Sequence, residues 1–304
     1  MESSFSLSKT LNKRPANSYR GRFAPSPSGF LHFGSLIAAL ASFLHAKSQQ
    51  GLWLVRIEDI DPPREQTGAS AAILKTLEAF GLHWDENVLY QSQQSSLYQE
   101  VLHDLASNNL SYYCQCTRAQ IKTIGGIYQG HCRALKLPAK QSAIRIINDL
   151  GIYRYHDLIQ GNVHCDKKLA QEDFTLLRKD GLFAYQLAVV VDDIYQGISH
   201  VIRGCDLLEP TARQLSFFSI LNHLAPQYGH IPLAITPDGY KLSKQNKAPA
   251  IDNNNPQPAL IAALNFLGQQ PPTELSTYPV NEIIHWAVNH WSVSQIPHQQ
   301  QIML

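Results

Sequence analysis

The chain has 304 residues, of which 44% are hydrophobic and 16% charged, with a formal net charge of +1. It contains no run of about 18 uninterrupted apolar residues, which excludes a membrane-spanning helix, and its near-neutral charge excludes a generally basic nucleic-acid-binding protein. The length suits one large domain with an insertion, or two domains. Because residues 1–19 lack an apolar signal core, we expect a cytoplasmic protein with a flexible N-terminal tail over that range.

The first elements alternate between strand and helix. The sequence "YRGRFA" predicts a short strand, and a helix follows with Ser35 as its expected N-cap. "GLWLVRIED", residues 51–59, is apolar enough for a buried strand, and Gly81 marks the end of the next helix. Such alternation predicts a parallel sheet with helical crossovers.

The alternation breaks near Ser111 and resumes with "FTLLRKDGLFAYQLAVVVDD", where Asp180-Gly181 signals a hairpin turn. We therefore expect an inserted subdomain over residues 111–173, between the halves of one α/β domain at 20–110 and 174–247.

Beyond the hairpin, "HIPLAI" predicts a last strand over residues 230–235, followed by a turn at "TPDG". Two helix-like segments, around 260–267 and 283–291, then form a C-terminal segment, 248–304, that we expect to pack on the α/β domain.

Three of the five cysteines, Cys114, Cys116 and Cys132, fall in one short segment. In a reducing compartment this grouping favours a metal site over disulfides, and a structural zinc site needs a fourth ligand. Ligand chemistry alone favours His131, since imidazole is a common zinc donor. The alternative is a group of three core cysteines with no metal.

Positive charge is unevenly distributed. The run "RALKLPAKQSAIR", residues 133–145, carries four basic residues and no acidic one, whereas no Lys or Arg follows Lys247. A polyanion would therefore bind the middle of the chain.

The stretch "RFAPSPSGFLHFGS" joins the first strand to the first helix. A glycine-containing turn at a helix N-terminus lets backbone N–H groups approach a phosphate, and Gly29 and Gly34 leave room for it. His32 can donate a hydrogen bond to charge developing on phosphorus. Alternatively, this is a tight loop whose histidine only caps the helix.

A second phosphate-handling element is "KLSK", in which Lys241 and Lys244 lie three apart after a hairpin turn. Two ammonium groups there could hold a polyphosphate, although Lys-x-x-Lys alone also describes a solvated surface loop. Its pairing with the histidine loop favours a nucleotide site.

These motifs resemble the class I glutamyl-tRNA synthetases, with "HFGS" in place of their HIGH signature and "KLSKQ" in place of KMSKS. The resemblance also covers "RIEDIDPPR", "YQLAVVVDD" and "HVIRGCDLL", and so extends from about Arg20 to Lys247. It implies a Rossmann-like catalytic domain with a zinc-bearing insertion that binds the acceptor end.

The resemblance also implies the site residues. Glutamate would be bound by Arg22, Phe23, Ala24, Pro25, Ser26, Glu58, Tyr185 and Arg203. ATP, with Mg²⁺, would be bound by His32, Gly34, Ser35 and Lys244, of which His32 and Lys244 would be catalytic together with Lys241. One zinc ion per chain would be held by Cys114, Cys116, Tyr128 and Cys132, with Tyr128 in place of His131.

Several of these residues also fit ordinary structural roles. Arg22 and Arg203 could be strand-edge surface residues, Glu58 could cap a turn, and Tyr185 could belong to the core.

The chemistry suits the residues present. The α-carboxylate of glutamate is ionised at neutral pH, so its attack on the α-phosphorus of ATP needs no general base. It needs positioning, positive charge and hydrogen-bond donors around the transition state.

The resemblance and the short C-terminal segment together indicate which RNA group accepts the activated glutamate. About 60 residues follow Lys244, too few for an anticodon-reading domain. Within the family, a short chain with a cysteine segment resembles the members that activate glutamate without tRNA and attach it to queuosine in tRNA(Asp), and we expect a monomer. Two alternatives are a truncated glutamyl-tRNA synthetase that charges the 3′ end of tRNA(Glu), and a non-catalytic zinc-bearing tRNA-binding module.

Overall fold

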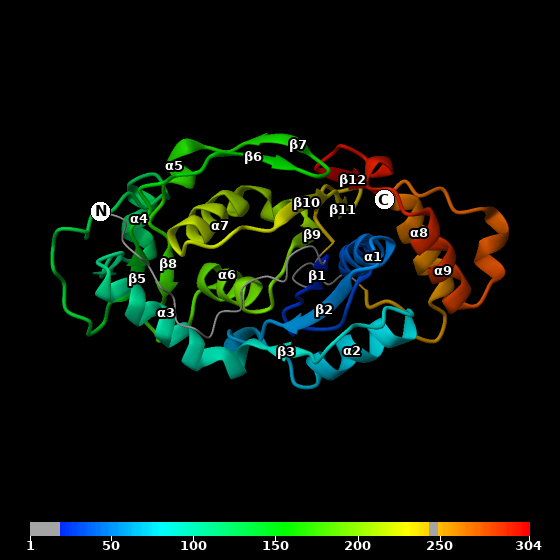
Figure 1. Ribbon diagram of the computed structural model, residues 1–304, viewed down its shortest axis with the longest axis horizontal. Helices are drawn as coiled ribbons and strands as arrows, with labels where there is room; N and C mark the ends of the chain where they lie inside the picture. The colour runs from blue at the N-terminus through cyan, green and yellow to red at the C-terminus, as the bar shows by residue number, and fades with distance from the viewer. Residues whose placement is uncertain (1–18, 243–248) are drawn as a thin grey trace.

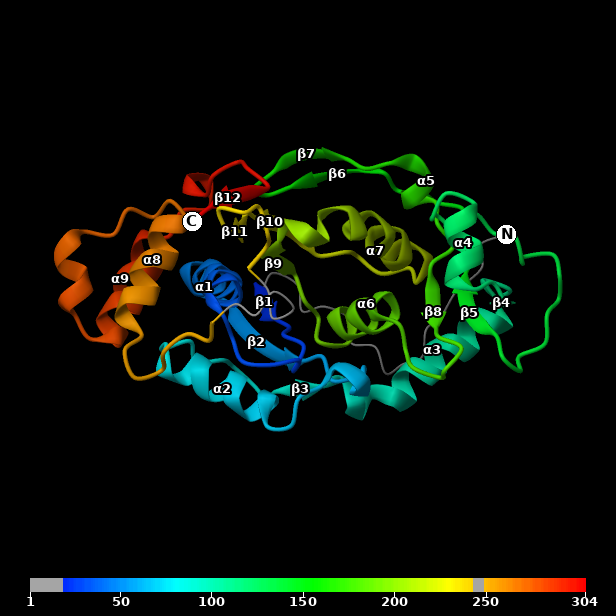
Figure 2. The same cartoon turned by 180° about the vertical axis from the view of Figure 1, so that it is seen from behind.

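The structure is a computed structural model that describes residues 19–242 and 249–304. The predicted tail, apart from Tyr19, and the predicted catalytic residue Lys244 lie outside the described residues. Figure 1 shows an elongated molecule, with a parallel sheet near the middle, the insertion at one end and the C-terminal helices at the other. Figure 2 gives the reverse view.

The central sheet is parallel, as the strand and helix alternation predicts. One part has the order β1 (Arg20–Phe23), β2 (Leu52–Ile57), β3 (Leu89–Tyr90), and the other pairs β9 (His200–Gly204) with β10 (Gln227–Ile231). Strand β9 lies beside β1, where the Ser199 amide donates to the Arg20 carbonyl at 2.8 Å. The strand order therefore reverses between β1 and β9, the position at which α/β sheets bind ligands.

The first helix, α1 (Phe33–Ser48), is confirmed, but its predicted N-cap is wrong. The N-cap is His32, whose extended backbone places ring Nδ1 3.3 Å from the Ser35 amide that it accepts from. Ser35 lies in the first turn. Apolar spacing located the buried face, whereas the true cap depends on an imidazole nitrogen replacing the usual hydroxyl oxygen.

Further helices flank the sheet: α2 (Ala69–Ala79), α3 (Ser95–Ser107), α6 (Tyr185–Tyr195) and α7 (Leu208–Ile220). The predicted stop after α2 is confirmed by Gly81, which has a φ of +71° that favours glycine. Buried apolar side chains of α3, α6 and α7 form a second core beside the one built on α1 and β2.

The insertion has its own antiparallel sheet, with the order β4 (Ser111–Cys114), β5 (Ala143–Ile146), β8 (Thr175–Leu177). Strand β8 lies just beyond the predicted end of the insertion at 173. The predicted hairpin turn follows it, with the Gly181 amide donating to the Arg178 carbonyl at 3.0 Å. A short helix, α4 (Arg118–Thr123), completes this end of the molecule.

An arm extends from the insertion along one edge of the molecule (Figure 1). It consists of the hairpin β6 (Arg154–Asp157) and β7 (Gly161–His164), followed by α5 (Lys167–Ala170). The arm meets the central sheet where the Leu158 amide donates to the Tyr228 carbonyl of β10 at 2.8 Å. The arm thus links the insertion directly to the sheet.

The predicted last strand, 230–235, is wrong in its bounds. Strand β10 begins at Gln227, and Pro232 separates it from β11 (Leu233–Ile235), which pairs with β12 (Gln301–Met303). Proline cannot donate a ladder hydrogen bond, so the chain changes partner there.

The two C-terminal helices, α8 (Gln257–Phe266) and α9 (Val280–His290), are confirmed and cover α1. Over residues 19–242 and 249–304, no helix combines the length and apolar character required to cross a bilayer.

Candidate functional site

A cavity of about 740 Å³ opens at the carboxyl ends of β1 and β9, beside the start of α1. Its volume is in the usual range for small-molecule sites. Its lining includes every predicted catalytic, glutamate-binding and ATP-binding residue within the described part of the chain: Arg22, Phe23, Ala24, Pro25, Ser26, His32, Gly34, Ser35, Glu58, Tyr185, Arg203 and Lys241. Sequence positions that span 220 residues therefore meet in one cavity.

Arg22 is held from behind by a buried ion-pair network. Its Nε and Nη2 donate to Asp193 of α6 at 3.2 and 3.4 Å, and Arg56 Nη2 donates to the same carboxylate at 2.5 Å. Burial acts to raise the pKa of Asp193, but the two guanidinium groups outweigh it and hold that pKa below its usual value. Arg22 is therefore a buried, oriented cation, and the strand-edge surface role is wrong.

Arg56 brings a second carboxylate into the network. Asp192 lies 3.9 Å from Arg56 Nε and accepts hydrogen bonds from Gln91 and Tyr98. Burial raises the pKa of Asp192 to about 6 despite these partners. The network thus holds two guanidinium groups against two aspartates at the base of the cavity.

Glu58 follows β2 directly and lines the same cavity. Burial raises the pKa of its carboxyl to about 7, against the opposing effect of Arg56 and Arg22. A carboxyl in this state is ready to accept a ligand cation, because a nearby positive charge would favour its ionised form.

Arg203 projects from β9 and is only 5% exposed. Its Nη2 donates to Thr211 and Gln214 at 2.6 and 2.7 Å, and its Nε donates to His230 at 3.1 Å. Its Nη1 finds no hydrogen-bond partner among the described residues. A surface role for Arg203 is also wrong, and the unpaired donor suits an anionic ligand.

The start of α1 forms another wall of the cavity. A Cβ atom on Gly34 would lie 3.3 Å from the Leu242 carbonyl oxygen, so glycine permits this close approach. On the far side of residues 243–248, the Ile251 amide donates to the Leu31 carbonyl at 3.1 Å. Residues on both sides of the segment 243–248 thus approach the region around His32.

Lys241 lines the cavity but is engaged in an ion pair. Its Nζ lies 2.5 Å from Asp206 Oδ2, and both side chains are about 40% exposed. If Lys241 contacts a phosphate, it must share or release Asp206.

A second cavity of about 520 Å³ adjoins the first and shares Ser26, Ser28, Glu58, Arg64 and Tyr185 with it. Its other lining residues are Pro27, Ile60, Asp61, Glu65, Gln91, Arg178, Phe183 and Ala184. Glu58 and Tyr185 therefore stand between two spaces large enough for separate ligands.

The three predicted cysteine ligands lie together in the insertion, where their sulfur atoms are all within 4.8 Å of one another. Cys116 and Cys132 are 3.6 Å apart, close to the separation expected for two sulfurs that each lie about 2.3 Å from a tetrahedral zinc ion. The Tyr128 hydroxyl accepts from the Cys132 amide at 2.8 Å, whereas the His131 side chain is exposed. The three cysteines could hold a metal ion, and the Tyr128 hydroxyl contacts the backbone of one of them, Cys132.

The basic run 133–145 is not a continuous cationic surface. Arg133 is paired with Asp149 and Asp173, and the buried Arg145 lies over the Tyr128 ring at 3.9 Å. Lys136 and Lys140 remain exposed. Half of the charge that the sequence attributes to this segment therefore stabilises the insertion itself.

The sequence motifs missed several residues that support the site, among them Arg56, Asp192, Asp157 and His230. Arg56 and Asp192 lie inside the quoted motifs but gave no sign of a role. Asp157 and His230 meet from positions 73 residues apart, which no local pattern indicates.

Comparison with known proteins places this geometry in a family. The family described as "tRNA synthetases class I (E and Q), catalytic domain" matches residues 18–301. A protein named "Glutamyl-Q tRNA(Asp) synthetase" from Colwellia psychrerythraea (strain 34H) is 64% identical over 302 residues, 96% of each chain. A protein of the same name from Escherichia coli (strain K12) is 54% identical over 279 residues, 92% of this chain and 91% of its own.

Among solved structures, a glutamate tRNA ligase from Elizabethkingia meningosepticum, in complex with its amino acid, superposes with a TM-score of 0.77. It is 24% identical, and the match covers 93% of this chain and 66% of that one. This likeness supports the fold.

Proposed function

Because the chain belongs to the class I tRNA synthetase family for glutamate and glutamine, we propose that it activates L-glutamate with ATP and transfers it to queuosine, at the wobble position of tRNA(Asp). The observation that supports glutamate activation is the charge arrangement of the 740 Å³ cavity, where the buried Arg22 and Arg203 and the carboxyl group of Glu58 line a single space. An amino acid with two carboxylates and one ammonium group has the complementary charges. The names of the relatives support the transfer of glutamate to queuosine in tRNA(Asp).

Within this proposal, each residue has a defined task. Arg22 and Arg203 bind carboxylate groups, Glu58 accepts the ammonium group, and the loop Phe23–Ser26 with Tyr185 fixes the orientation of glutamate. The N-terminus of α1, with His32, Gly34 and Ser35, stabilises phosphate charge. Lys241 and Lys244 add positive charge in the transition state, and Mg²⁺ accompanies ATP as it does in other phosphoryl chemistry.

The second cavity offers an entrance for the acceptor. It adjoins the proposed glutamate site at Glu58 and Tyr185, on a different side from His32 and Lys241. A nucleoside of an unpaired anticodon loop can be splayed out of its stack and inserted into such a space. Its hydroxyl group could then attack the glutamyl carbonyl of the adenylate, which forms the ester and releases AMP on the side of His32.

Zinc is the metal that we propose for the insertion, with Cys114, Cys116, Cys132 and Tyr128 as ligands. Three thiolates in a compact, largely buried group suit a closed structural zinc site. Such a metal would fix β4 and the segment around Cys132 relative to each other.

The zinc proposal predicts one tightly bound ion per chain in freshly purified, reduced protein, measured by elemental analysis. Tyr128→Phe should weaken metal retention against a chelator, and His131→Ala should not. Cys114→Ser should unfold the insertion while leaving the central sheet intact. Wild-type protein without metal, or metal loss in His131→Ala alone, would contradict this assignment.

The role of Glu58 predicts a pH-dependent KM for glutamate. Its carboxyl has a pKa of about 7 and must be ionised to pair with an ammonium group, so affinity should increase as pH rises through 7. Below that value, KM should increase by up to about tenfold per pH unit. We expect Glu58→Gln to raise KM and abolish this dependence, measured by ATP–pyrophosphate exchange between pH 6 and 8.

The matched control is Glu86→Gln, the same substitution at a half-exposed surface carboxylate paired with Arg20. It should retain the pH dependence of wild-type protein. A pH profile that Glu58→Gln leaves unchanged would exclude Glu58 as the ammonium partner.

The acceptor proposal is tested with defined RNAs. Radiolabelled glutamate should be transferred to tRNA(Asp) that carries queuosine, and not to the same tRNA with unmodified guanosine. Nuclease mapping should find the label in the anticodon fragment, and transfer should weaken steeply with salt as phosphate contacts release counterions. Equally efficient attachment to the 3′ end of unmodified tRNA(Asp) or of tRNA(Glu) would support the truncated-synthetase alternative instead.

A further inference from the structure

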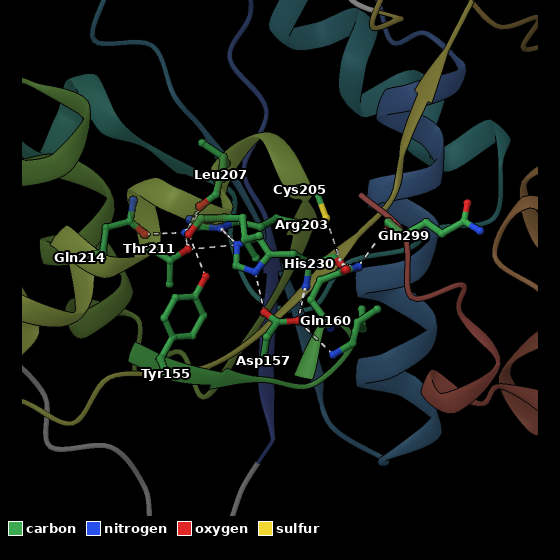
Figure 3. Close-up of polar contacts among 12 residues, drawn as sticks. Tyr155, Asp157, Gln160, Arg203, Cys205, Leu207, Thr211, Gln214, His230 and Gln299 are labelled. Carbon is green, nitrogen blue, oxygen red and sulfur yellow. Dashed lines mark hydrogen bonds and ion pairs between the residues drawn. The ribbon is translucent and has the colours of Figure 1, made fainter. Parts of the chain in front are cut away.

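A buried polar chain lies behind Arg203 (Figure 3). Arg203 Nε donates to His230 Nε2 at 3.1 Å, and His230 Nδ1 lies 2.6 Å from Asp157 Oδ2. His230 and Asp157 are completely buried, so neither can contact a substrate in the cavity. Any effect that they have on the ligand must act through Arg203.

The hydrogen bonds of this chain select one tautomer of His230. A guanidinium group only donates, so the contact from Arg203 Nε requires His230 Nε2 to be the nitrogen without a proton. The Thr211 hydroxyl lies 3.0 Å from the same nitrogen. The proton on Nδ1 is then donated to Asp157. Burial is the largest cause that lowers the pKa of His230, and the charge of Arg203 lowers it further, whereas Asp157 acts to raise it. The net effect is a lowered pKa, so the ring is neutral near pH 7.

Asp157 is itself fixed by the hairpin of the arm. Its Oδ1 accepts from the amides of Ile159, Gln160 and His230 at 2.8 to 3.0 Å, which leaves Oδ2 for the imidazole. Burial acts to raise the pKa of Asp157, but these hydrogen bonds hold it below its usual value. The carboxylate is thus ionised and has a single orientation.

The same contacts leave one nitrogen of Arg203, the buried Nη1, without a hydrogen-bond partner among the described residues. Its Nε is bound to His230 and its Nη2 to Thr211 and Gln214, as Figure 3 shows, while Nη1 has no partner within the described residues. Arg203 lines the 740 Å³ cavity. A buried N–H of a cation without a partner is costly unless a ligand completes it.

We propose that Asp157 and His230 are positioning residues, which fix the imidazole tautomer that accepts from Arg203 and so hold the guanidinium group of Arg203 in the orientation that binds a carboxylate of the substrate. This inference rests on the proposed function, in which that substrate is glutamate. Because Asp157 belongs to the arm, the amino-acid site depends on the arm that extends from the insertion, as well as on the central sheet.

The decisive variant is Asp157→Asn, which keeps an oxygen for the three amides but turns an N–H donor toward His230 Nδ1. The imidazole then carries its proton on Nε2, facing the N–H of Arg203 Nε. In glutamate-dependent ATP–pyrophosphate exchange without RNA, we expect the KM for glutamate to rise about tenfold or more, with the KM for ATP within about twofold of wild type. The ¹⁵N NMR signals of His230 should show the exchange of tautomers directly.

The matched control is Asp166→Asn, the same substitution in the same arm. The Asp166 carboxylate also accepts a backbone hydrogen bond, from Leu169 at 2.9 Å, but it has no contact with His230. This variant should keep the wild-type KM for both substrates.

A second pair of variants decides the question if Asp157→Asn fails to fold. The amide oxygen of His230→Gln can still accept from Arg203, whereas His230→Leu cannot. Positioning predicts a lower KM for glutamate in the Gln variant than in the Leu variant, with the same KM for ATP in both. A purely structural role would instead raise the KM for glutamate and the KM for ATP together in the less stable variant.

The outcomes separate the two proposals. A normal glutamate KM in Asp157→Asn despite the altered tautomer, or equal increases in the KM for glutamate and ATP, would overturn the positioning role alone. Wild-type protein that shows no glutamate-dependent exchange would overturn the proposed function, and this inference with it.

Discussion

The pairing of Arg22 and Arg56 with Asp193 is the interaction on which the rest of the structure depends. It joins β1 and β2, from the first half of the α/β domain, to α6, which follows the insertion. Burying these charges is favourable only while all of them remain paired, and removing one partner of such a pair costs about 3–5 kcal/mol. The network therefore fixes how the two halves of the domain meet, and the cavity lies at that junction.

The site consists of charged groups and hydrogen-bond donors that have no complete set of partners among the residues that the structure describes. Two arginines face Asp192 and Asp193, so Glu58 remains as a third carboxyl whose pKa lies near neutrality. Arg203 similarly has hydrogen-bond partners on Nε and Nη2, whereas its buried Nη1 has none among the described residues. A ligand that brings an ammonium group and carboxylates completes both sets, which gives selectivity from electrostatics rather than from shape alone.

The sequence predicts the parts of this architecture that depend on local patterns. Strands β1 and β2 and helices α8 and α9 follow from apolar periodicity, and the turn at Asp180-Gly181 follows from turn chemistry. The N-cap of α1 could not be found in this way, because His32 uses a ring nitrogen where a hydroxyl is usual. Pro232 is a local signal for the break between β10 and β11, but the new partner of β11 is not predictable from it, because β12 lies far along the chain.

Charge was the least predictable property of the chain. Arg133 and Arg145 read as part of a basic surface, yet their partners Asp173 and Tyr128 are brought to them only by folding of the insertion. The hydrogen bonds that link Arg203 to His230 and Asp157 could not be predicted from the sequence either, because the three residues come from elements far apart in the chain. Motif resemblance found the residues that line the cavity, but only the structure identifies those behind them.

The account is tested most directly by the amino-acid specificity of ATP–pyrophosphate exchange in protein freed of RNA. If the charges of Arg22, Arg203 and Glu58 define the site, L-glutamate should support exchange. L-glutamine lacks the side-chain carboxylate, so its kcat/KM should be lower by about a thousandfold or more. Comparable exchange with glutamine, or exchange that begins only when tRNA is added, would contradict it.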